Sequence, residues 1–252
     1  MCPHASDLAE LAVPIQEEGK ALRRRLEAAN AELYLSIRSE IARGGGSGAL
    51  LPWMQSSASQ NDPGGPSPGP GYDWRDELTS GVLQLREPRE PDLDQSSEMV
   101  PYQPTPVRHI LHLIAANLLS KNDVFVDLGS GLGHVPLLVS MLAGARSLGI
   151  EIQPAYVASA QECAQRLGLS RVRFIAEDAR ETDLSSGTVF YLYSPFTGSI
   201  LTDVLTRLRR ESMRRSIGIC SLGPCTKTLA NETWLKANSL PDAGRIAVFT
   251  PR

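Results

Sequence analysis

The chain has 252 residues, of which 42% are hydrophobic and 21% charged, and its formal net charge is −3. This length suffices for one main domain with a sizeable core and an appendage. The negative charge argues against a general electrostatic attraction to nucleic acid or to an anionic membrane. The four cysteines lack metal-type spacing, which argues against a disulfide scaffold or a zinc module and indicates a reducing compartment.

Membrane and export signals are not recognisable in the sequence. No run approaches the roughly 18 to 20 apolar residues that span a bilayer. The start of the chain has no basic region followed by an apolar one, as a signal peptide would. We therefore expect a soluble, cytoplasmic protein.

The N-terminal region, residues 1–42, has the pattern of an amphipathic helix from residue 15 onward. Apolar residues recur three or four positions apart, with Glu and Arg between them: Leu22, Leu26, Ala29, Leu33, Ile37 and Ile41. Both charge signs occur on the polar face, which disfavours a membrane-surface helix. The stripe predicts packing against the chain's own domain or against a helical partner.

Composition changes twice before the main domain. Residues 43–71 begin with GGGSG and end with DPGGPSPGPG, which predicts a linker or disordered loop. Residues 72–100 are mixed and acidic, and their expected burial points are Trp74, Leu78, Val82 and Leu83.

From residue 101 onward the sequence predicts one α/β domain, residues 101–252. Thr105 can cap a helix that starts at Pro106. Strands and helices then alternate with short loops, which predicts a doubly wound, mainly parallel sheet. The expected strands are 124–128, 147–152, 172–176, 188–193 and 216–220, the helices are 134–143, 155–167 and 198–211, and the run 246–249 is expected as an edge strand.

A glycine-rich turn follows the first strand in the sequence VFVDLGSGLG, residues 124–133. Glycines there let the backbone turn sharply and let a ligand approach closely. The dinucleotide fingerprint would need glycine at position 134 or 136, which are His134 and Pro136, so a dehydrogenase is disfavoured. Asp127, just before the glycines, suits a cationic amine better than a pyrophosphate.

Two further acidic residues follow the next strands. Glu151, in the sequence GIEI, could accept hydrogen bonds from ribose hydroxyls, and Asp178, in EDA, could accept one from an adenine amino group. Each acid alone is more often a solvated loop residue. Acids at three successive strand ends together indicate a ligand site at the carboxyl edge of the sheet.

The series VDLGSGLG, GIEI and EDA resembles the first three motifs of class I S-adenosylmethionine-dependent methyltransferases, over roughly residues 100 to 220. The resemblance implies a Rossmann-like fold, typically with seven strands, and S-adenosylmethionine as cofactor. It assigns Asp127 to the loop and the methionine amino group, Glu151 to the ribose, and Asp178 with Ala179 to the adenine. The glycine turn would line the cofactor through Gly129, Ser130, Gly131 and Gly133.

A narrower resemblance lies upstream, where Tyr102-Gln103-Pro104-Thr105 leads through a helix into the glycine motif. This arrangement is similar to histone-lysine methyltransferases of the disruptor-of-telomeric-silencing type. In that family the loop folds over the cofactor, which makes Tyr102 and Thr105 candidates for cofactor contact. The alternative is that Thr105 only caps a helix and Tyr102 only packs.

The fourth motif of these enzymes faces the methyl group, and here it contains Ser194-Pro195-Phe196. This matches neither the asparagines of the histone enzymes nor the Asn/Asp-Pro-Pro-aromatic motif of amide and amine methyltransferases. Ser194 could orient an acceptor but is a poor base, so a lysine would have to arrive neutral or lose its proton to water. Tyr102, Tyr193 and Phe196 could form an aromatic wall beside the sulfonium.

The sequence thus predicts a methyltransferase that acts by in-line displacement, with Ser194, Tyr193 and Phe196 as catalytic candidates and a protein side chain as acceptor. A small molecule or RNA is the second acceptor class, and a non-catalytic cofactor-binding regulator is the alternative outside enzymes. His109 and His112 have no metal-type neighbours, so no metal is expected. The arginines at 207–215 are expected to form a solvated face at a helix end.

Overall fold

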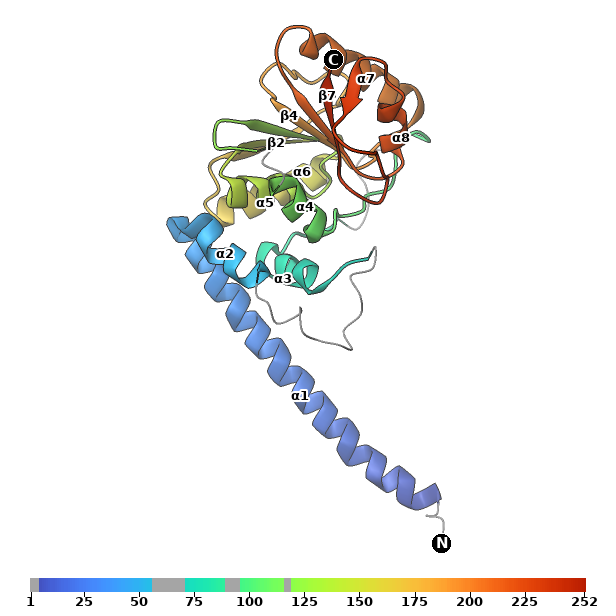
Figure 1. Ribbon diagram of the computed structural model, residues 1–252. Coiled ribbons are helices and arrows are strands. Elements are labelled where there is room, and N and C mark those ends of the chain that lie inside the picture. The colour runs from blue at the N-terminus through green and yellow to red at the C-terminus, as the bar shows by residue number, and fades with distance from the viewer. Residues whose placement is uncertain (1–4, 56–70, 89–95, 116–118) are drawn as a thin grey trace.

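The computed structural model describes residues 5–55, 71–88, 96–115 and 119–252, with side chains from residue 16 onward. Its centre is a seven-stranded sheet in the order β3-β2-β1-β4-β5-β7-β6 (Figure 1). The strands are β1 Val124–Leu128, β2 Arg146–Glu151, β3 Val172–Ala176, β4 Val189–Leu192, β5 Gly218–Ser221, β6 Leu235–Ala237 and β7 Ala247–Pro251. The predicted Rossmann-like architecture is confirmed.

The first five strands are parallel, and the last two run antiparallel to their neighbours. The prediction of an edge strand near residues 246–249 is wrong, because β7 lies between β5 and β6. The three-residue strand β6 forms the edge instead. It was not recognisable because Leu235 is its only buried residue and gives no periodic pattern.

Helices cover both faces of the sheet (Figure 1). One face packs against α4 Val107–Ala115, α5 His134–Ala143 and α6 Pro154–Arg166, and the other against α7 Gly198–Ser212 and α8 Cys225–Ala230. Alternate strand residues point to opposite faces: Phe125 and Tyr191 join the first core, and Val126 and Phe190 join the second.

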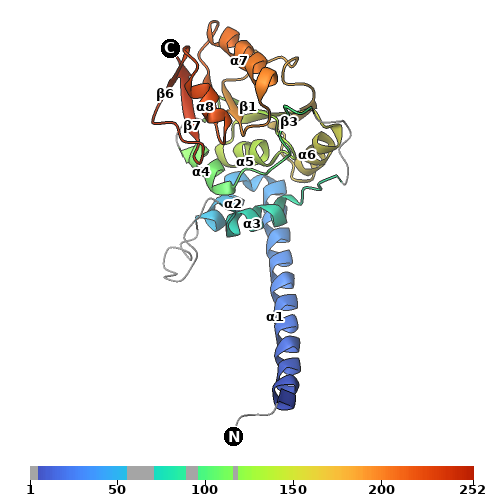
Figure 2. The same ribbon diagram turned by 90° about the vertical axis from the view of Figure 1, so that its right-hand side faces the viewer.

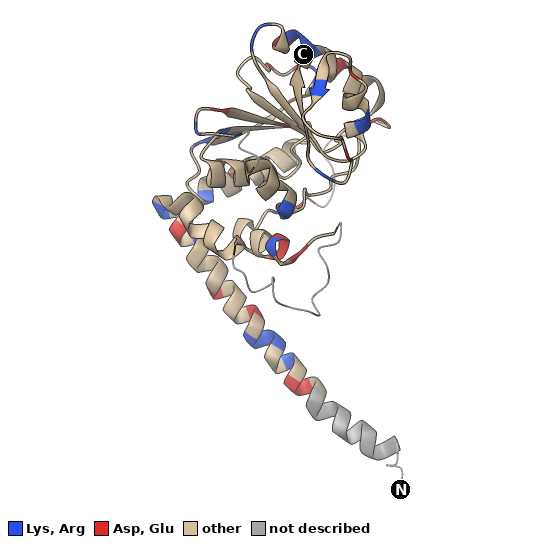
Figure 3. Ribbon diagram, viewed as in Figure 1, with Lys and Arg blue, Asp and Glu red and all other residues tan. Residues whose placement is uncertain are grey.

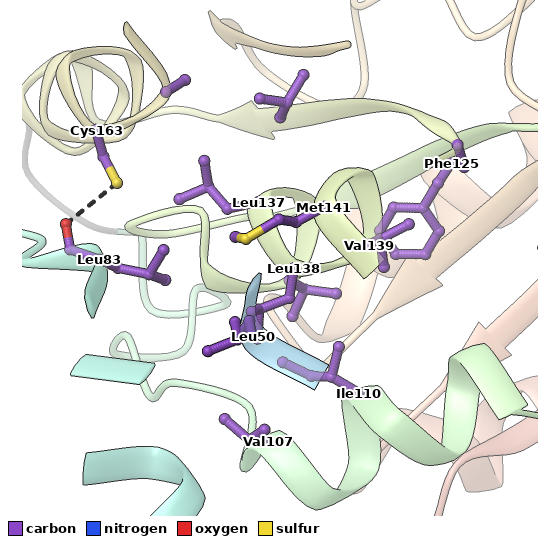
Figure 4. Close-up of a cluster of buried hydrophobic side chains, with 14 of the residues drawn as sticks. Leu50, Leu83, Val107, Ile110, Phe125, Leu137, Leu138, Val139, Met141 and Cys163 are labelled. Atoms are coloured by element: carbon purple, nitrogen blue, oxygen red, sulfur yellow. Dashed lines mark hydrogen bonds between the residues drawn. The ribbon is translucent and has the colours of Figure 1, made fainter. Parts of the chain in front are cut away.

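The N-terminal helices form a further layer outside α4 and α5. They are α1 Ala5–Glu40, a kink at Ile41–Gly45 where Gly44 has φ +92°, α2 Gly46–Met54 and α3 Trp74–Leu83. Leu50 of α2 packs with Leu138 and Ile110, and the Cys163 thiol donates to the Leu83 carbonyl at 3.2 Å (Figure 4). The linker prediction for residues 43–71 is therefore wrong over α2, because Ala49, Leu50 and Met54 are buried against the domain. Residues 56–70 lie outside the described part.

The α3 helix connects α1 to the α/β core. The predicted burial of Leu78, Val82 and Leu83 is confirmed, whereas Trp74 is 36% exposed because it begins α3 and is stacked under Arg75 instead. The Asp76 carboxylate accepts from the Val107 backbone N–H at 2.8 Å, at the first residue of α4. Asp76, rather than the predicted Thr105 side chain, therefore caps this helix.

A glycine inside α3 makes close packing against α1 possible. A Cβ added at Gly81 would lie 2.1 Å from Cε2 of Tyr34. We expect Gly81→Ala to lower the free energy of unfolding by about 1 to 3 kcal/mol through overpacking, measured by urea denaturation. Gly48→Ala in α2 is the control, because a Cβ there would meet nothing within 4 Å. This substitution should raise the free energy of unfolding by about 0.4 to 1 kcal/mol. Equal effects of the two substitutions would contradict this packing.

Candidate functional site

A cavity of about 510 Å³ opens at the carboxyl edge of the parallel strands. Its lining includes Asp127 near the end of β1, Glu151 at the end of β2, and Asp178 after β3. The structure thus brings together the three acids that the sequence placed at successive strand ends. Open α/β sheets bind their ligands at this edge.

The turn between β1 and α5 is closely covered by other side chains. Gly131 has φ +53°, and a Cβ there would lie 2.1 Å from Cδ2 of Tyr102. At Gly129 a Cβ would lie 2.2 Å from the Pro195 Cβ. The sequence predicts that these glycines allow close approach of a ligand, and the structure shows that they also accommodate the protein's own side chains. Next to them the buried Ser130 hydroxyl has no hydrogen-bond partner among the described residues.

Tyr102 is held over this turn by two aromatic neighbours. Its hydroxyl lies 2.7 Å from Nδ1 of His134, and its ring meets the edge of Tyr156 at a centroid distance of 5.6 Å. Burial lowers the pKa of His134 to about 4, so the imidazole is neutral at pH 7 and shares this hydrogen bond with the tyrosine hydroxyl. Sequence reasoning missed Tyr156, because no motif marks it on α6.

The segment that carries Tyr102, residues 98–105, forms a covering loop over the cavity. Val100 N–H donates to the Pro195 carbonyl at 3.0 Å, and Thr197 N–H donates to the Glu98 carbonyl at 2.7 Å. The Glu98 carboxylate accepts from the Ile200 N–H at 3.0 Å in the first turn of α7. This backbone hydrogen bond lowers the pKa of Glu98. The loop is therefore fastened to the segment that follows β4.

The other end of the covering loop is fixed by hydroxyl groups. Thr105 is buried and shares a hydrogen bond of 3.1 Å with the Tyr191 hydroxyl of β4. The Tyr72 hydroxyl donates to the Pro104 carbonyl at 2.9 Å. Both Tyr102 and Thr105 thus face the cavity that the resemblance assigned to them.

Glu151 and Asp127 have different environments although both line the cavity. The Glu151 carboxylate accepts from the Gly131 N–H at 2.8 Å and from the Gln153 N–H at 3.0 Å, which ties β2 to the glycine turn. Asp127 is fully buried in the floor, and burial together with the Glu151 charge raises its pKa. Each carboxylate keeps lone pairs that a ligand donor could use.

Asp178 begins the loop after β3, beside Ala179. Arg180 forms an ion pair with its carboxylate at 2.7 Å, and the hydrogen bonds from that guanidinium lower the pKa of Asp178. The carboxylate is therefore ionised at neutral pH. An adenine amino group would share it with Arg180.

The segment after β4 corrects one sequence interpretation. Ser194 adopts φ +44°, and its hydroxyl donates to the Leu222 carbonyl at 3.1 Å while accepting from the Cys225 N–H at 2.9 Å. Its proton is therefore used at the Leu222 carbonyl just after β5, and this geometry favours a structural role for Ser194 over the acceptor-orienting role predicted from sequence, although Ser194 lines the cavity. Tyr193 and Phe196 do line the cavity, and Phe196 is largely buried in the second core.

Other candidates lie outside this chemistry. No group of three or more metal-type ligands occurs in the described part, and His109 reaches only the cavity wall. Arg207 and Arg215 donate to loop carbonyls, Arg207 to Thr182 at 2.6 Å and Arg215 to Leu184 at 2.7 Å, so they are structural and not merely solvated. Among the described helices, none has both the length and the apolar character of a membrane span.

A model of the family described as histone methylation protein DOT1 matches residues 95–190. This range contains the covering loop and the three strand-end acids. No curated protein matches the chain.

Several solved structures resemble the fold. An RNA methyltransferase from Salinibacter ruber, in complex with S-adenosyl-L-homocysteine, is 26% identical, with 59% of this chain and 92% of that chain covered and a TM-score of 0.46. A SAM-dependent methyltransferase from Aquifex aeolicus is 16% identical, with coverages of 56% and 87% and a TM-score of 0.45. Geranyl diphosphate C-methyltransferase from Streptomyces coelicolor A3(2) is 19% identical, with 44% of this chain and 41% of that chain covered and a TM-score of 0.38.

The sheet order, the site at its carboxyl edge and the family match together define a class I S-adenosylmethionine-dependent methyltransferase. Within that class, residues 95–190 are similar to the family described as histone methylation protein DOT1. The site fits S-adenosylmethionine, because the unpartnered Ser130 hydroxyl and the Glu151 and Asp178 carboxylates offer hydrogen-bonding groups along the cavity.

Replacing Ser194 tests its structural role. Ser194→Ala leaves the buried Cys225 N–H without an acceptor, so the free energy of unfolding should fall by about 1 to 3 kcal/mol in urea denaturation. The kcat of the folded enzyme should change by less than about threefold, because no acceptor depends on the hydroxyl. A hundredfold fall in kcat with unchanged stability would restore the catalytic assignment.

Replacing Glu151 tests the ribose assignment. Glu151→Ala should weaken S-adenosylmethionine binding by more than about tenfold in calorimetry, because charge-assisted hydrogen bonds to the ribose are lost. Glu162→Ala is the control, since that carboxylate bonds only Arg166 on the surface of α6. Thermal melts establish that both variants are folded at the temperature of the titration. Unchanged affinity in Glu151→Ala would defeat the assignment.

Proposed function

We propose that the protein methylates a side-chain amine of a protein substrate, of the lysine type. The observation that carries this proposal is the covering loop, in which Tyr102 and Thr105 lie over the glycine turn within the range matched by the DOT1 family. That combination distinguishes the site from a bare nucleotide-binding sheet edge.

S-adenosylmethionine, when bound, would supply a sulfonium methyl group to an acceptor amine, and the electron pair of the broken C–S bond would stay on the sulfur. Glu151 would hold the ribose, and Asp178 with Ala179 would hold the adenine. The glycine turn, with Asp127 in the floor, would receive the methionine end, and Tyr102 and Thr105 would exclude water above it. These residues act mainly by positioning, which in favourable models supplies about 7 to 11 kcal/mol of the barrier reduction.

The methyl acceptor would enter the part of the cavity that borders the segment after β4. The side chains there favour an amine in its uncharged form. The carboxylates of the lining lie at the carboxyl ends of β1, β2 and β3 or directly after them: Asp127, Glu151, Glu177 and Asp178. The segment after β4 contributes the aromatic rings of Tyr193 and Phe196 instead. An amine that enters this side loses water without gaining a carboxylate partner, and desolvation lowers the pKa of an ammonium group. Lysine can therefore lose its proton to water before attack without a base from Ser194.

The test is methyl transfer from labelled S-adenosylmethionine to a lysate separated into protein, RNA, DNA and small-molecule fractions. We expect label in the protein fraction and, by mass spectrometry, methyl groups on lysine. Tyr193→Ala should lower kcat by about tenfold or more while cofactor affinity is kept, and Tyr193→Phe should retain activity, since the ring is what borders the acceptor. Label confined to RNA or small molecules would overturn the acceptor assignment. Absence of label despite cofactor binding would favour a non-catalytic regulator.

A further inference from the structure

The outer part of α1 projects away from the rest of the protein (Figures 1 and 2). Residues 16–29 are all exposed, and Leu22 and Leu26, one turn apart, are 65% and 60% exposed. An isolated helix without tertiary contacts is marginal in water, and these leucines would gain from burial. Both facts indicate that another helix covers this part of α1.

The spacing of the uncovered side chains is that of a coiled coil. With Leu22 at heptad position d and Leu26 at position a, the core positions from 19 to 33 are Gly19, Leu22, Leu26, Ala29 and Leu33. All five are apolar or small. In the sequence, Ile15 continues the same frame seven residues before Leu22. The frame ends at Leu33, where the side chain packs against the main core.

The charges along α1 suit pairing with a second copy of the chain. Glu17 and Glu18 precede Arg23, Arg24 and Arg25, so an acidic segment is followed by a basic one (Figure 3). A parallel pair would place Glu18 beside Arg23 of the partner subunit, but it would bring both catalytic domains to the same end of the coil. An antiparallel pair centred between residues 20 and 21 places Glu18 beside Arg25 of the partner subunit, twice by symmetry. It also leaves each catalytic domain at its own end of the coil.

We propose that the protein forms a homodimer through an antiparallel two-helix coiled coil of α1, with Leu22 and Leu26 in its core and Glu18–Arg25 pairs at its flanks. This interface is independent of the proposed reaction, because its residues lie outside the cavity.

The first experiment measures the mass of the full chain by light scattering and sedimentation over a range of concentrations. We expect a dimer, and we expect Leu26→Lys to weaken dimerisation by at least tenfold. Leu35→Lys is the matched control, because Leu35 is also exposed, at 57%, but occupies heptad position c. Thermal melts confirm that both variants fold. A monomeric parent chain, or equal effects of the two substitutions, would overturn the proposal.

The second experiment tests orientation with charge reversals. Glu18→Arg alone and Arg25→Glu alone should each weaken the dimer by roughly tenfold, because each turns two attractive pairs into repulsive ones. An equimolar mixture of the two variants should restore parent-like association, since every flanking pair is then of opposite sign. A parallel coil pairs Glu18 with residue 23 of the other copy, so a dimer unaffected by Arg25→Glu would overturn the antiparallel arrangement.

Discussion

The ring of Tyr102 can lie on the turn between β1 and α5 because residue 131 has no side chain. The positive φ of Gly131 and the 2.1 Å approach to Cδ2 of Tyr102 exclude every other residue type there. The contact closes the covering loop onto the site and places the Tyr102 hydroxyl at Nδ1 of His134. Substituting the glycine would therefore disturb both the cofactor turn and its cover.

The carboxylates of Glu98 and Asp76 hold the covering loop in the position from which Tyr102 contacts Gly131. Glu98 holds the start of the covering loop on the first turn of α7, and Asp76 holds the helix that follows the loop, through the Val107 N–H. Both use unpaired backbone donors at a helix N-terminus, which bind carboxylates well. The loop is thus fastened on one side to the acceptor segment and on the other to the N-terminal helices. Neither Glu98 nor Asp76 belongs to a recognisable sequence motif, because the backbone group that each one binds lies far away in the sequence.

The sequence predicted those features that depend on local pattern. Short apolar strand runs and glycine turns located β1, α5 and β3, and spacing located Asp127, Glu151 and Asp178. The sequence did not predict the features that depend on tertiary contacts. The GGGSG segment suggested a linker, yet Leu50 is fully buried because α2 packs on α5. Ser194 was placed in the site by its position after β4, but its hydroxyl direction depends on a positive φ and on Leu222 and Cys225. Neither factor has a sequence signature.

The N-terminal helices connect α1 to the cavity through a short series of contacts. Tyr34 of α1 lies against Gly81 of α3, and Asp76 of the same helix caps α4 directly after the covering loop. The contacts join α1, α3 and α4 into one packed unit beside the covering loop. The exposed leucines of α1 and the cap of α4 are therefore separated by one helix of ten residues, α3. A second copy that covers Leu22 and Leu26 would bind the same helix whose Tyr34 packs against α3.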